Sequence, residues 1–152
     1  MHTGQRYVLI SPCRNEAAYM RQTLDSVLAQ TVLPAQWVIV DDGSTDDTPA
    51  ILAEYAQRYP WIRIVTRSDR GHRAVGPGVV DAFYSGYAVI DPAQYDFLCK
   101  LDLDLRLPPR YFEILMRRMN DDRSIATCSG KAYIEEDGEM VNERHGDDTS
   151  LG

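Results

Sequence analysis

Short, largely apolar runs recur along the chain. They cover residues 7–10, 37–40, 62–65 and 95–101. The uninterrupted runs at 7–10 and 37–40 are typical of strands buried on both faces, because a strand with one solvated face would alternate apolar and polar residues. The other two runs are predicted to be strands as well. A further strand is predicted over residues 125–134, followed by a hairpin turn at Asp137-Gly138.

The segments between the runs have helical periodicity. The first helix is predicted to open at residues 15–16 and to stop near residue 31, with an apolar face made of Met20, Leu24, Val27 and Leu28. The second is expected over about residues 49–59. Thr48 is its predicted N-cap, and Pro49 takes the first helical position.

Two more helices are predicted farther along the chain. One follows a glycine-containing loop at residues 71–78 and faces inward with Val79, Phe83 and Tyr87. The other starts at Pro108-Pro109, with Phe112, Leu115 and Met119 facing inward. Strands that alternate with helices predict an α/β fold, a mostly parallel central sheet with helices on both faces. No repeat or linker interrupts the sequence, so we expect residues 1–152 to form a single domain.

Charge and composition restrict the classes of partner. The formal net charge is −7, and no basic run could neutralise a nucleic-acid backbone. The three cysteines form no Cys-x-x-Cys motif, which favours a reducing compartment over a disulfide framework. Neither an apolar run of about 18 residues nor a signal-peptide pattern occurs. We therefore expect a cytoplasmic protein with no membrane segment in this chain, in which any membrane association comes through a longer parent or its acceptor.

Asp102 and Asp104 follow the fourth apolar run and are separated by one residue. In an extended backbone their side chains would point the same way. Two carboxylates form a hard-oxygen site that suits Mg²⁺ or Mn²⁺, which take one or two protein carboxylates and complete their coordination with water and phosphate oxygens. Taken alone, the pair is explained more simply by two solvated acids at the end of a strand.

Polar segments that contain acids directly follow three of the predicted strands, at residues 11–16, 41–44 and 102–104. In open parallel sheets, ligands bind outside the carboxyl ends of the strands, so the three segments are expected to meet at one ligand-binding edge. Turn and cap chemistry alone would explain either of the first two, because Asp, Gly, Ser and Thr are preferred in strand-to-helix turns.

These segments together resemble the successive signatures of family 2 glycosyltransferases with the GT-A fold. They read Ile-Ser-Pro-Cys-Arg-Asn-Glu at residues 10–16, Val-Ile-Val-Asp-Asp-Gly-Ser-Thr-Asp at 38–46 and Lys-Leu-Asp-Leu-Asp-Leu-Arg-Leu-Pro-Pro at 100–109. The resemblance covers roughly residues 7–134. It implies the Rossmann-like, nucleotide-binding half of such an enzyme.

By position, the resemblance also implies a nucleotide site. Pro12, Asn15 and Glu16 would line the nucleoside pocket, and Asp42 would accept a hydrogen bond from the base. Arg73 matches a position where relatives carry a basic residue near the nucleotide.

The metal site is implied in the same way. Asp102 would lie by the ribose and the metal, and Asp104 would be the direct ligand of a divalent cation, Mn²⁺ or Mg²⁺, that bridges the diphosphate. Leu105 stands where many relatives carry a third acid, which removes one contact around the metal.

The implied activity is inverting, metal-dependent transfer of a sugar from a nucleotide-diphosphate sugar, with UDP favoured, to a saccharide or lipid-linked acceptor. The general base of such enzymes lies in a later segment, so we assign no catalytic base. This chain is expected to be the truncated, donor-binding N-terminal part of a longer transferase. A sheet that stops partway exposes an unpaired edge, which predicts self-association.

Two alternatives stay open. A nucleotidyltransferase of similar fold would usually carry a glycine-rich, basic loop where residues 12–16 stand. A non-catalytic nucleotide-sugar or protein-binding module would keep the fold without turnover. A dinucleotide-dependent oxidoreductase is disfavoured, because Gly-x-Gly-x-x-Gly is absent after the first strand.

Overall fold

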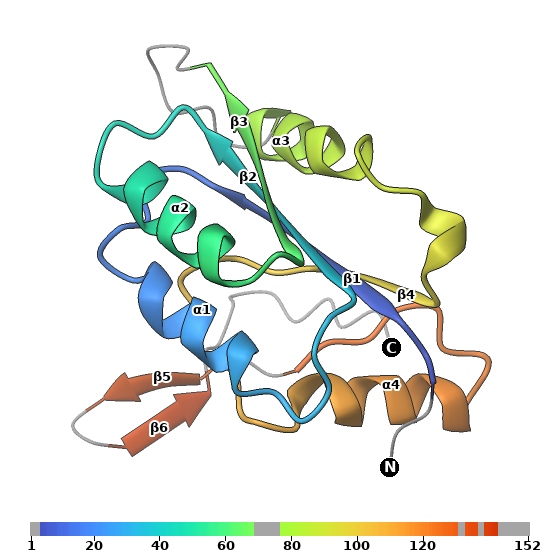
Figure 1. Cartoon of the computed structure of the whole chain (residues 1–152). Helices are drawn as coiled ribbons and strands as arrows, with labels where there is room; N and C mark the ends of the chain where they lie inside the picture. The colour runs from blue at the N-terminus through green and yellow to red at the C-terminus, as the bar shows by residue number, and fades with distance from the viewer. Residues whose placement is uncertain (1–3, 69–76, 131–132, 137–138, 143–152) are drawn as a thin grey trace. The chain divides into compact units, whose positions relative to one another are not determined.

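The first part of the chain is built on a parallel sheet. The computed structural model describes residues 4–68, 77–130, 133–136 and 139–142, and the chain divides into two compact units, Met1–Phe112 and Glu113–Gly152. In the first unit, four parallel strands lie in the order β3-β2-β1-β4 (Figure 1). They are β1 (Tyr7–Cys13), β2 (Gln36–Asp42), β3 (Ile62–Arg67) and β4 (Phe97–Lys100).

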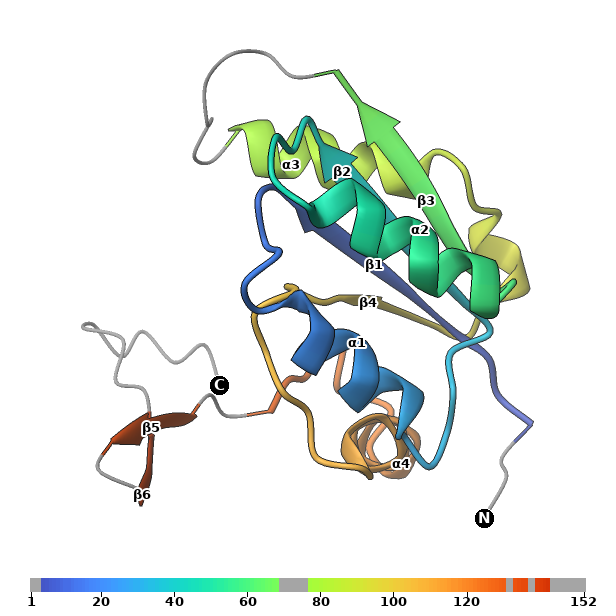
Figure 2. The same cartoon turned by 60° about the vertical axis from the view of Figure 1, so that its left-hand side comes forward.

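Helices cover both faces of this sheet. α1 (Met20–Leu28) and α2 (Thr48–Arg58) lie on one face, and α3 (Pro77–Tyr87) lies on the other, as both views show (Figure 1 and Figure 2). A short 3-10 helix, η1 (Pro92–Gln94), leads into β4. The predicted α/β fold is confirmed, including the parallel order of its strands.

The two central strands are longer than predicted. β1 continues to Cys13 and β2 to Asp42, because the backbone pairing runs on past the apolar residues. Pro12 lies inside β1 just beyond Ile10, where the pairing of β1 with β4 ends, so the missing N–H of the proline leaves no strand partner unsatisfied on that side.

The second unit contains a hairpin. α4 (Tyr111–Asp121) begins in the first unit and continues into the second, where β5 (Tyr133–Glu136) pairs antiparallel with β6 (Glu139–Asn142). The predicted hairpin is confirmed, although residues 137–138 lie outside the described residues. The predicted strand over residues 125–134 is wrong for 125–130, where the chain is irregular after a turn in which the Asp122 carboxylate accepts the N–H of Ser124.

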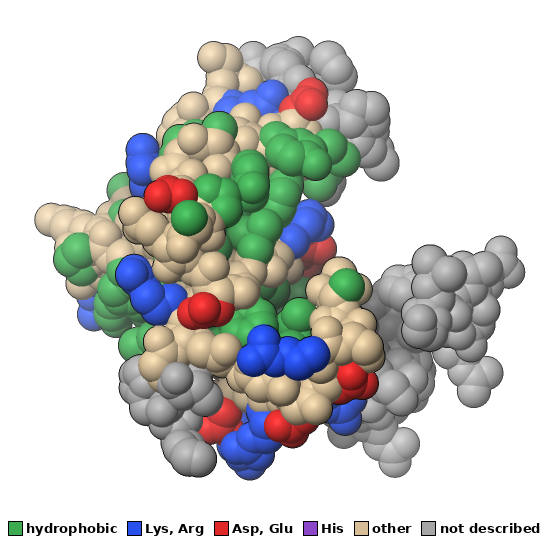
Figure 3. All heavy atoms as spheres, turned by 90° about the vertical axis from the view of Figure 1, so that its right-hand side faces the viewer, with side chains coloured by type: hydrophobic (Ala, Val, Ile, Leu, Met, Phe, Trp, Pro, Cys, Tyr) green, Lys and Arg blue, Asp and Glu red, His purple; other side chains and the backbone are tan. Residues whose placement is uncertain are grey.

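β4 is an edge strand of the described sheet, since it pairs with β1 and with no other described strand. Figure 3 views the side on which α3 and β4 lie in Figure 1, and hydrophobic side chains are exposed there among charged ones. The large exposed hydrophobic residues of these two elements are Val79, Val80, Tyr84 and Leu98. An apolar, unpaired edge favours association, and self-association stays a prediction.

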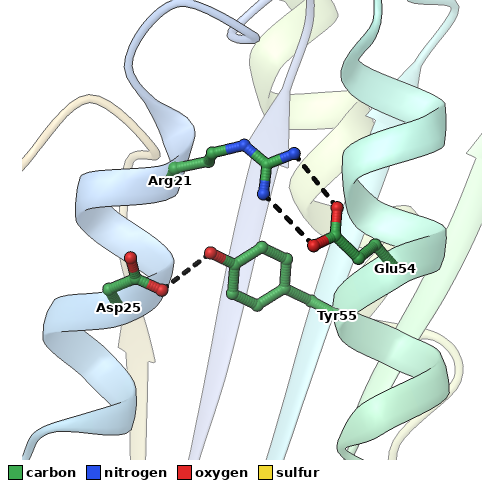
Figure 4. Close-up of polar contacts among 4 residues, drawn as sticks. All are labelled: Arg21, Asp25, Glu54 and Tyr55. Atoms are coloured by element: carbon green, nitrogen blue, oxygen red, sulfur yellow. Dashed lines mark hydrogen bonds and ion pairs between the residues drawn. The ribbon is translucent and has the colours of Figure 1, made fainter.

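Polar contacts join α1 to α2. Arg21 donates two hydrogen bonds to the carboxylate of Glu54, at 3.0 and 3.4 Å, and the Tyr55 hydroxyl donates to Asp25 at 2.7 Å (Figure 4). Arg21 and Glu54 are about half exposed, so their pair adds little to stability. Burial of the apolar faces of both helices contributes more.

No helix of the described residues is both long enough and apolar enough to cross a membrane.

α3 approaches the sheet closely through small residues. Ala82 is 1% exposed and packs in a cluster with Ile10, Val38 and Val40, and Phe83 and Tyr87 pack against its border as predicted. Val79 is 42% exposed, so its predicted inward position is wrong. The small side chains on this face of α3 let the helix backbone pack closely against the sheet. Side chains of the strands fill the space that a larger residue on the helix would occupy.

Gly86→Ala tests this close approach. A Cβ at residue 86 would lie 2.8 Å from Cγ2 of Ile10 and 2.9 Å from Cγ2 of Val40, and both methyls belong to β-branched side chains with stiff χ1 angles. Overpacking of about 1–3 kcal/mol exceeds the gain of about 1 kcal/mol in helix propensity. We expect a net loss of unfolding free energy, measured by urea denaturation. Ser85→Ala, at the preceding position, is the control and should be neutral or stabilising. Equal effects of the two variants would contradict this account.

Candidate functional site

A pocket of about 260 Å³ lies at the carboxyl ends of β1, β2 and β4, where the three polar segments meet. Its described lining consists of Pro12, Cys13, Arg14, Glu16, Asp42, Val79, Ala82, Lys100, Asp102, Leu103 and Asp104.

The pocket contains most of the residues predicted from the sequence. Pro12, Glu16, Asp42, Asp102 and Asp104 all line it. Asn15 is not among the lining residues, and Arg73 lies outside the described residues.

The pocket also contains residues that the sequence analysis did not single out. Arg14 stands within the first polar segment next to Asn15, and Lys100, the last residue of β4, stands two residues before Asp102, so their neighbourhood was the available signal. Val79 and Ala82 come from α3, whose periodicity indicated only a core-facing helix. Their place at the pocket follows from how α3 packs on the sheet.

Asp41 and Asp42 have different roles because successive residues of a strand point to opposite faces. Asp41 is 2% exposed, and its carboxylate accepts the N–H of Ser44 at 3.1 Å, which closes the turn after β2. Gly43 adopts φ +71° in this turn, a conformation that favours glycine. Asp42 is thus left to face the pocket.

Asn15 holds two loops together instead of lining the pocket. Its side-chain oxygen accepts the backbone N–H groups of Thr45 at 2.8 Å and Asp46 at 3.2 Å, and its own N–H donates to the Ser44 hydroxyl at 2.9 Å. Asn15 has φ +53°, which asparagine tolerates better than most residues. The loop after β1 is therefore fixed to the loop after β2.

Two more residues complete this connection. The Thr48 hydroxyl accepts the N–H of Glu16 at 3.0 Å, and Asp46 accepts the N–H of Ala17 at 3.2 Å and that of Thr48 at 2.9 Å. Thr48 is the first residue of α2, so its prediction as N-cap is wrong: its hydroxyl serves the other loop. Partial burial raises the pKa of Asp46, but the hydrogen bonds from Thr48 and Ala17 outweigh burial and lower this pKa.

Asp102 and Asp104 follow the end of β4, as predicted, and they lie in an irregular segment with a turn instead of in extended backbone. The N–H of Leu101 donates to the Ile10 carbonyl at 3.1 Å, and this is where β4 leaves the sheet. Leu101 and Leu103 are 4% and 1% exposed, whereas both aspartates are exposed. The buried leucines thus keep the two carboxylates on the pocket side.

The segment after the aspartates is held by two buried polar residues, Ser26 in α1 and Gln30 just after the end of α1. The Ser26 hydroxyl accepts the N–H of Leu107 at 3.1 Å. Gln30 donates to the Pro108 carbonyl at 2.7 Å and accepts the N–H of Phe112 at 3.2 Å. These contacts explain why Ser26 and Gln30 are buried although they are polar, and they hold the segment that follows Asp102 and Asp104.

The lining carries more negative than positive side chains, so it favours a phosphate ligand that binds together with a cation. Four carboxylates face two cationic side chains, those of Arg14 and Lys100, and Lys100 Nζ is 3.0 Å from Asp102. Burial, followed by the nearby carboxylates of Asp41 and Glu16, raises the pKa of the Cys13 thiol. That thiol stays protonated and is a poor nucleophile.

The carboxylate oxygens at the pocket suit a divalent cation whose other ligands are water and phosphate oxygens. No group of three or more His, Cys, Asp or Glu side chains within the described ranges could enclose a metal ion. Mg²⁺ and Mn²⁺ need no such cage, because one or two carboxylates, water and phosphate oxygens complete their coordination. Asp102 and Asp104 supply exposed, hard oxygen atoms at the pocket.

The sequence matches the family model of glycosyl transferase family 2 over residues 8–149. The chain belongs to this family. Among curated relatives, the putative glycosyltransferase EpsH of Bacillus subtilis is 27% identical over 128 residues, which are 84% of this chain and 34% of that protein. This family 2 chain therefore spans about a third of the length of that relative.

Solved structures are similar to this family 2 chain in fold. S. aureus TarS in complex with UDP has a TM-score of 0.61 at 21% identity. The mannosyltransferase PcManGT from Pyrobaculum calidifontis, in complex with GDP-Man and Mn²⁺, has a TM-score of 0.60 at 22% identity. Both alignments cover 76% of this chain and 32% of the other. These likenesses confirm the GT-A fold.

Gln30→Leu tests how the turn after α1 holds the segment that follows the aspartates. The change leaves the N–H of Phe112 and the carbonyl of Pro108 without the amide, and we expect a loss of about 2–4 kcal/mol in unfolding free energy. Gln22→Leu, the same substitution at an exposed position of α1, should change stability by about 0.5 kcal/mol or less. Urea unfolding measures both, and equal losses would refute the anchoring role.

Asp46→Asn tests the connection between the two loops. The folded-state pKa of Asp46 is lowered from about 3.8, so its contribution is full above that value and is lost as the pH falls through the folded-state pKa. We expect the variant to be less stable than wild type by roughly 0.5–1 kcal/mol at pH 6, with the difference shrinking below pH 4. Asp47→Asn removes a neighbouring charge and serves as control. A difference that is independent of pH would count against this reading.

Proposed function

We propose that this chain carries the donor-binding part of a metal-dependent glycosyltransferase. The reaction moves a sugar from a nucleotide-diphosphate sugar to a hydroxyl group of a saccharide or lipid-linked acceptor, with inversion at the anomeric carbon. Inversion rests on the family resemblance alone, and no catalytic base is assigned. The single observation that carries the proposal is the pocket, where Asp42 lies with Asp102 and Asp104 although some sixty residues separate them.

The two ends of the pocket would bind different parts of the nucleotide-sugar donor. At the end formed by the first two loops, Asp42 accepts an N–H of the base, and Pro12 and Glu16 line the nucleoside. At the other end, Asp104 holds the divalent cation, with Asp102 near the ribose. The hydrogen bonds between the two loops keep the nucleoside end preorganised, which reduces the entropy lost on binding.

The chemistry explains why an acidic pocket suits an anionic donor. When bound, a divalent cation supplies the positive charge that stabilises the diphosphate leaving group as its bond to the sugar breaks. Without the cation, the carboxylates of the lining would repel the diphosphate. Arg14 and Lys100 add positive charge at the same edge.

The choice of nucleotide is part of the proposal. We favour a uridine nucleotide, in line with the UDP bound to S. aureus TarS, and a guanosine nucleotide is second, in line with the GDP-Man bound to PcManGT. Both bases present an N–H group that a carboxylate can accept.

Thermal unfolding with UDP or GDP, with and without Mn²⁺, tests the donor site. A ligand at about one hundred times its dissociation constant adds roughly 2.7 kcal/mol, a shift of roughly 5–10 °C for a chain of this size. We expect one nucleotide to give this shift only when Mn²⁺ is present, because the carboxylates otherwise repel the diphosphate.

Two aspartate variants complete this experiment. Asp104→Asn should lose the Mn²⁺-dependent part of the shift, whereas Asp121→Asn, an exposed acid at the end of α4, should keep it. A shift that needs neither Mn²⁺ nor Asp104 would contradict the metal site. No shift with either nucleotide would contradict the donor site.

A further inference from the structure

Arg67 lies beside the pocket aspartate without lining the pocket itself. It is the last residue of β3 and stands opposite Asp42, the last residue of β2, in the parallel ladder. Nη1 of Arg67 is 3.5 Å from Oδ1 of Asp42, and the two side chains are 21% and 14% exposed. Asp42 lines the pocket, whereas Arg67 is not among its lining residues. Arg67 can therefore act on a ligand through Asp42.

The contact between these two side chains is loose. A hydrogen bond between charged groups is normally about 2.7–2.9 Å long, and here the atoms are 3.5 Å apart. Nη1 of Arg67 is buried and has no hydrogen-bond partner among the described residues. A buried donor without a bond is costly, so a small movement of the Asp42 carboxylate toward it would be favourable.

A second arginine holds the backbone of Asp42 from the loop after β1. Nη1 of Arg14 donates to the Asp42 carbonyl oxygen at 3.4 Å. The neighbouring Asp41 is already engaged in the turn, where it accepts the N–H of Ser44. Asp42 is thus the carboxylate of this strand end that faces the pocket, with its backbone bonded by Arg14 and its side chain beside Arg67.

We propose that Arg67 is a positioning residue that orients the Asp42 carboxylate for recognition of the nucleobase. The inference rests on the proposed function, since it concerns the donor site. A carboxylate oriented in this way only accepts hydrogen bonds, so it selects bases with an N–H at the corresponding edge, such as uracil and guanine. Cytosine and adenine present a lone pair at that ring nitrogen.

The test is a double-mutant cycle on binding. Dissociation constants for UDP and GDP with Mn²⁺ are measured by calorimetry for wild type, Arg67→Met, Asp42→Asn and the double variant. Arg67→Met should weaken binding about tenfold or more, because it removes a charged partner of the acceptor. In the Asp42→Asn background, Arg67→Met should have no further effect. Additive losses would overturn the inference.

Two further measurements separate positioning from a general loss of structure. Arg67→Met should leave the affinity for inorganic pyrophosphate with Mn²⁺ unchanged, because that ligand has no base, and an equal loss for pyrophosphate would indicate a structural role. Arg67→Lys keeps the charge but not the planar fork, so it should restore part of the affinity. If Arg67→Met does not fold, Arg67→Lys carries the test and must bind the nucleotide more weakly than wild type.

The failures of the two proposals are distinguishable. Wild type that binds no nucleotide overturns the donor site and this inference with it. Wild type that binds a nucleotide, together with Arg67 variants that bind it equally well, overturns only the role of Arg67.

Discussion

The pairing of β1 with strands on both sides determines where the pocket lies. β1 pairs with β2 as far as Cys13 but with β4 only as far as Ile10, where the carbonyl of Ile10 accepts the N–H of Leu101. The next bond of a parallel ladder would need an N–H from residue 12, and Pro12 has none. The chain therefore leaves the sheet at this step, and the aspartates follow in a turn beside the ends of β1 and β2.

The rest of the site depends on contacts between segments that are distant in sequence. Asn15, Thr48 and Asp46 join the first two loops, while Ser26 and Gln30 hold the segment that follows the aspartates. None of these five residues lines the pocket. Their side chains satisfy backbone groups that irregular segments would otherwise leave unpaired. This gives the loops of the site a fixed shape on a rigid sheet.

The difference between regular elements and contacts of distant segments explains what the sequence could and could not predict. Strands, helices and the convergence of the polar segments follow from periodicity and from the topology of parallel sheets, and they lead to residues such as Asp42 and Asp104. Asparagine and threonine are common in local turns and helix caps. The sequence alone therefore does not show that Asn15 and Thr48 instead form hydrogen bonds to another loop. Likewise, four-residue spacing placed Val79 in the core, but the small residues Ala82 and Gly86 form the contact with the sheet.

The charges of the pocket distinguish the two aspartates of the proposed metal site. Asp102 is paired with Lys100, whereas the described residues provide no ion pair for Asp104. A cation at Asp102 would have to displace the lysine, while a cation at Asp104 would leave that pair intact and keep a second positive charge near the diphosphate. The ion pair is largely exposed and worth little by itself. This difference agrees with the proposal, based on the family resemblance, that Asp104 is the direct ligand of the metal.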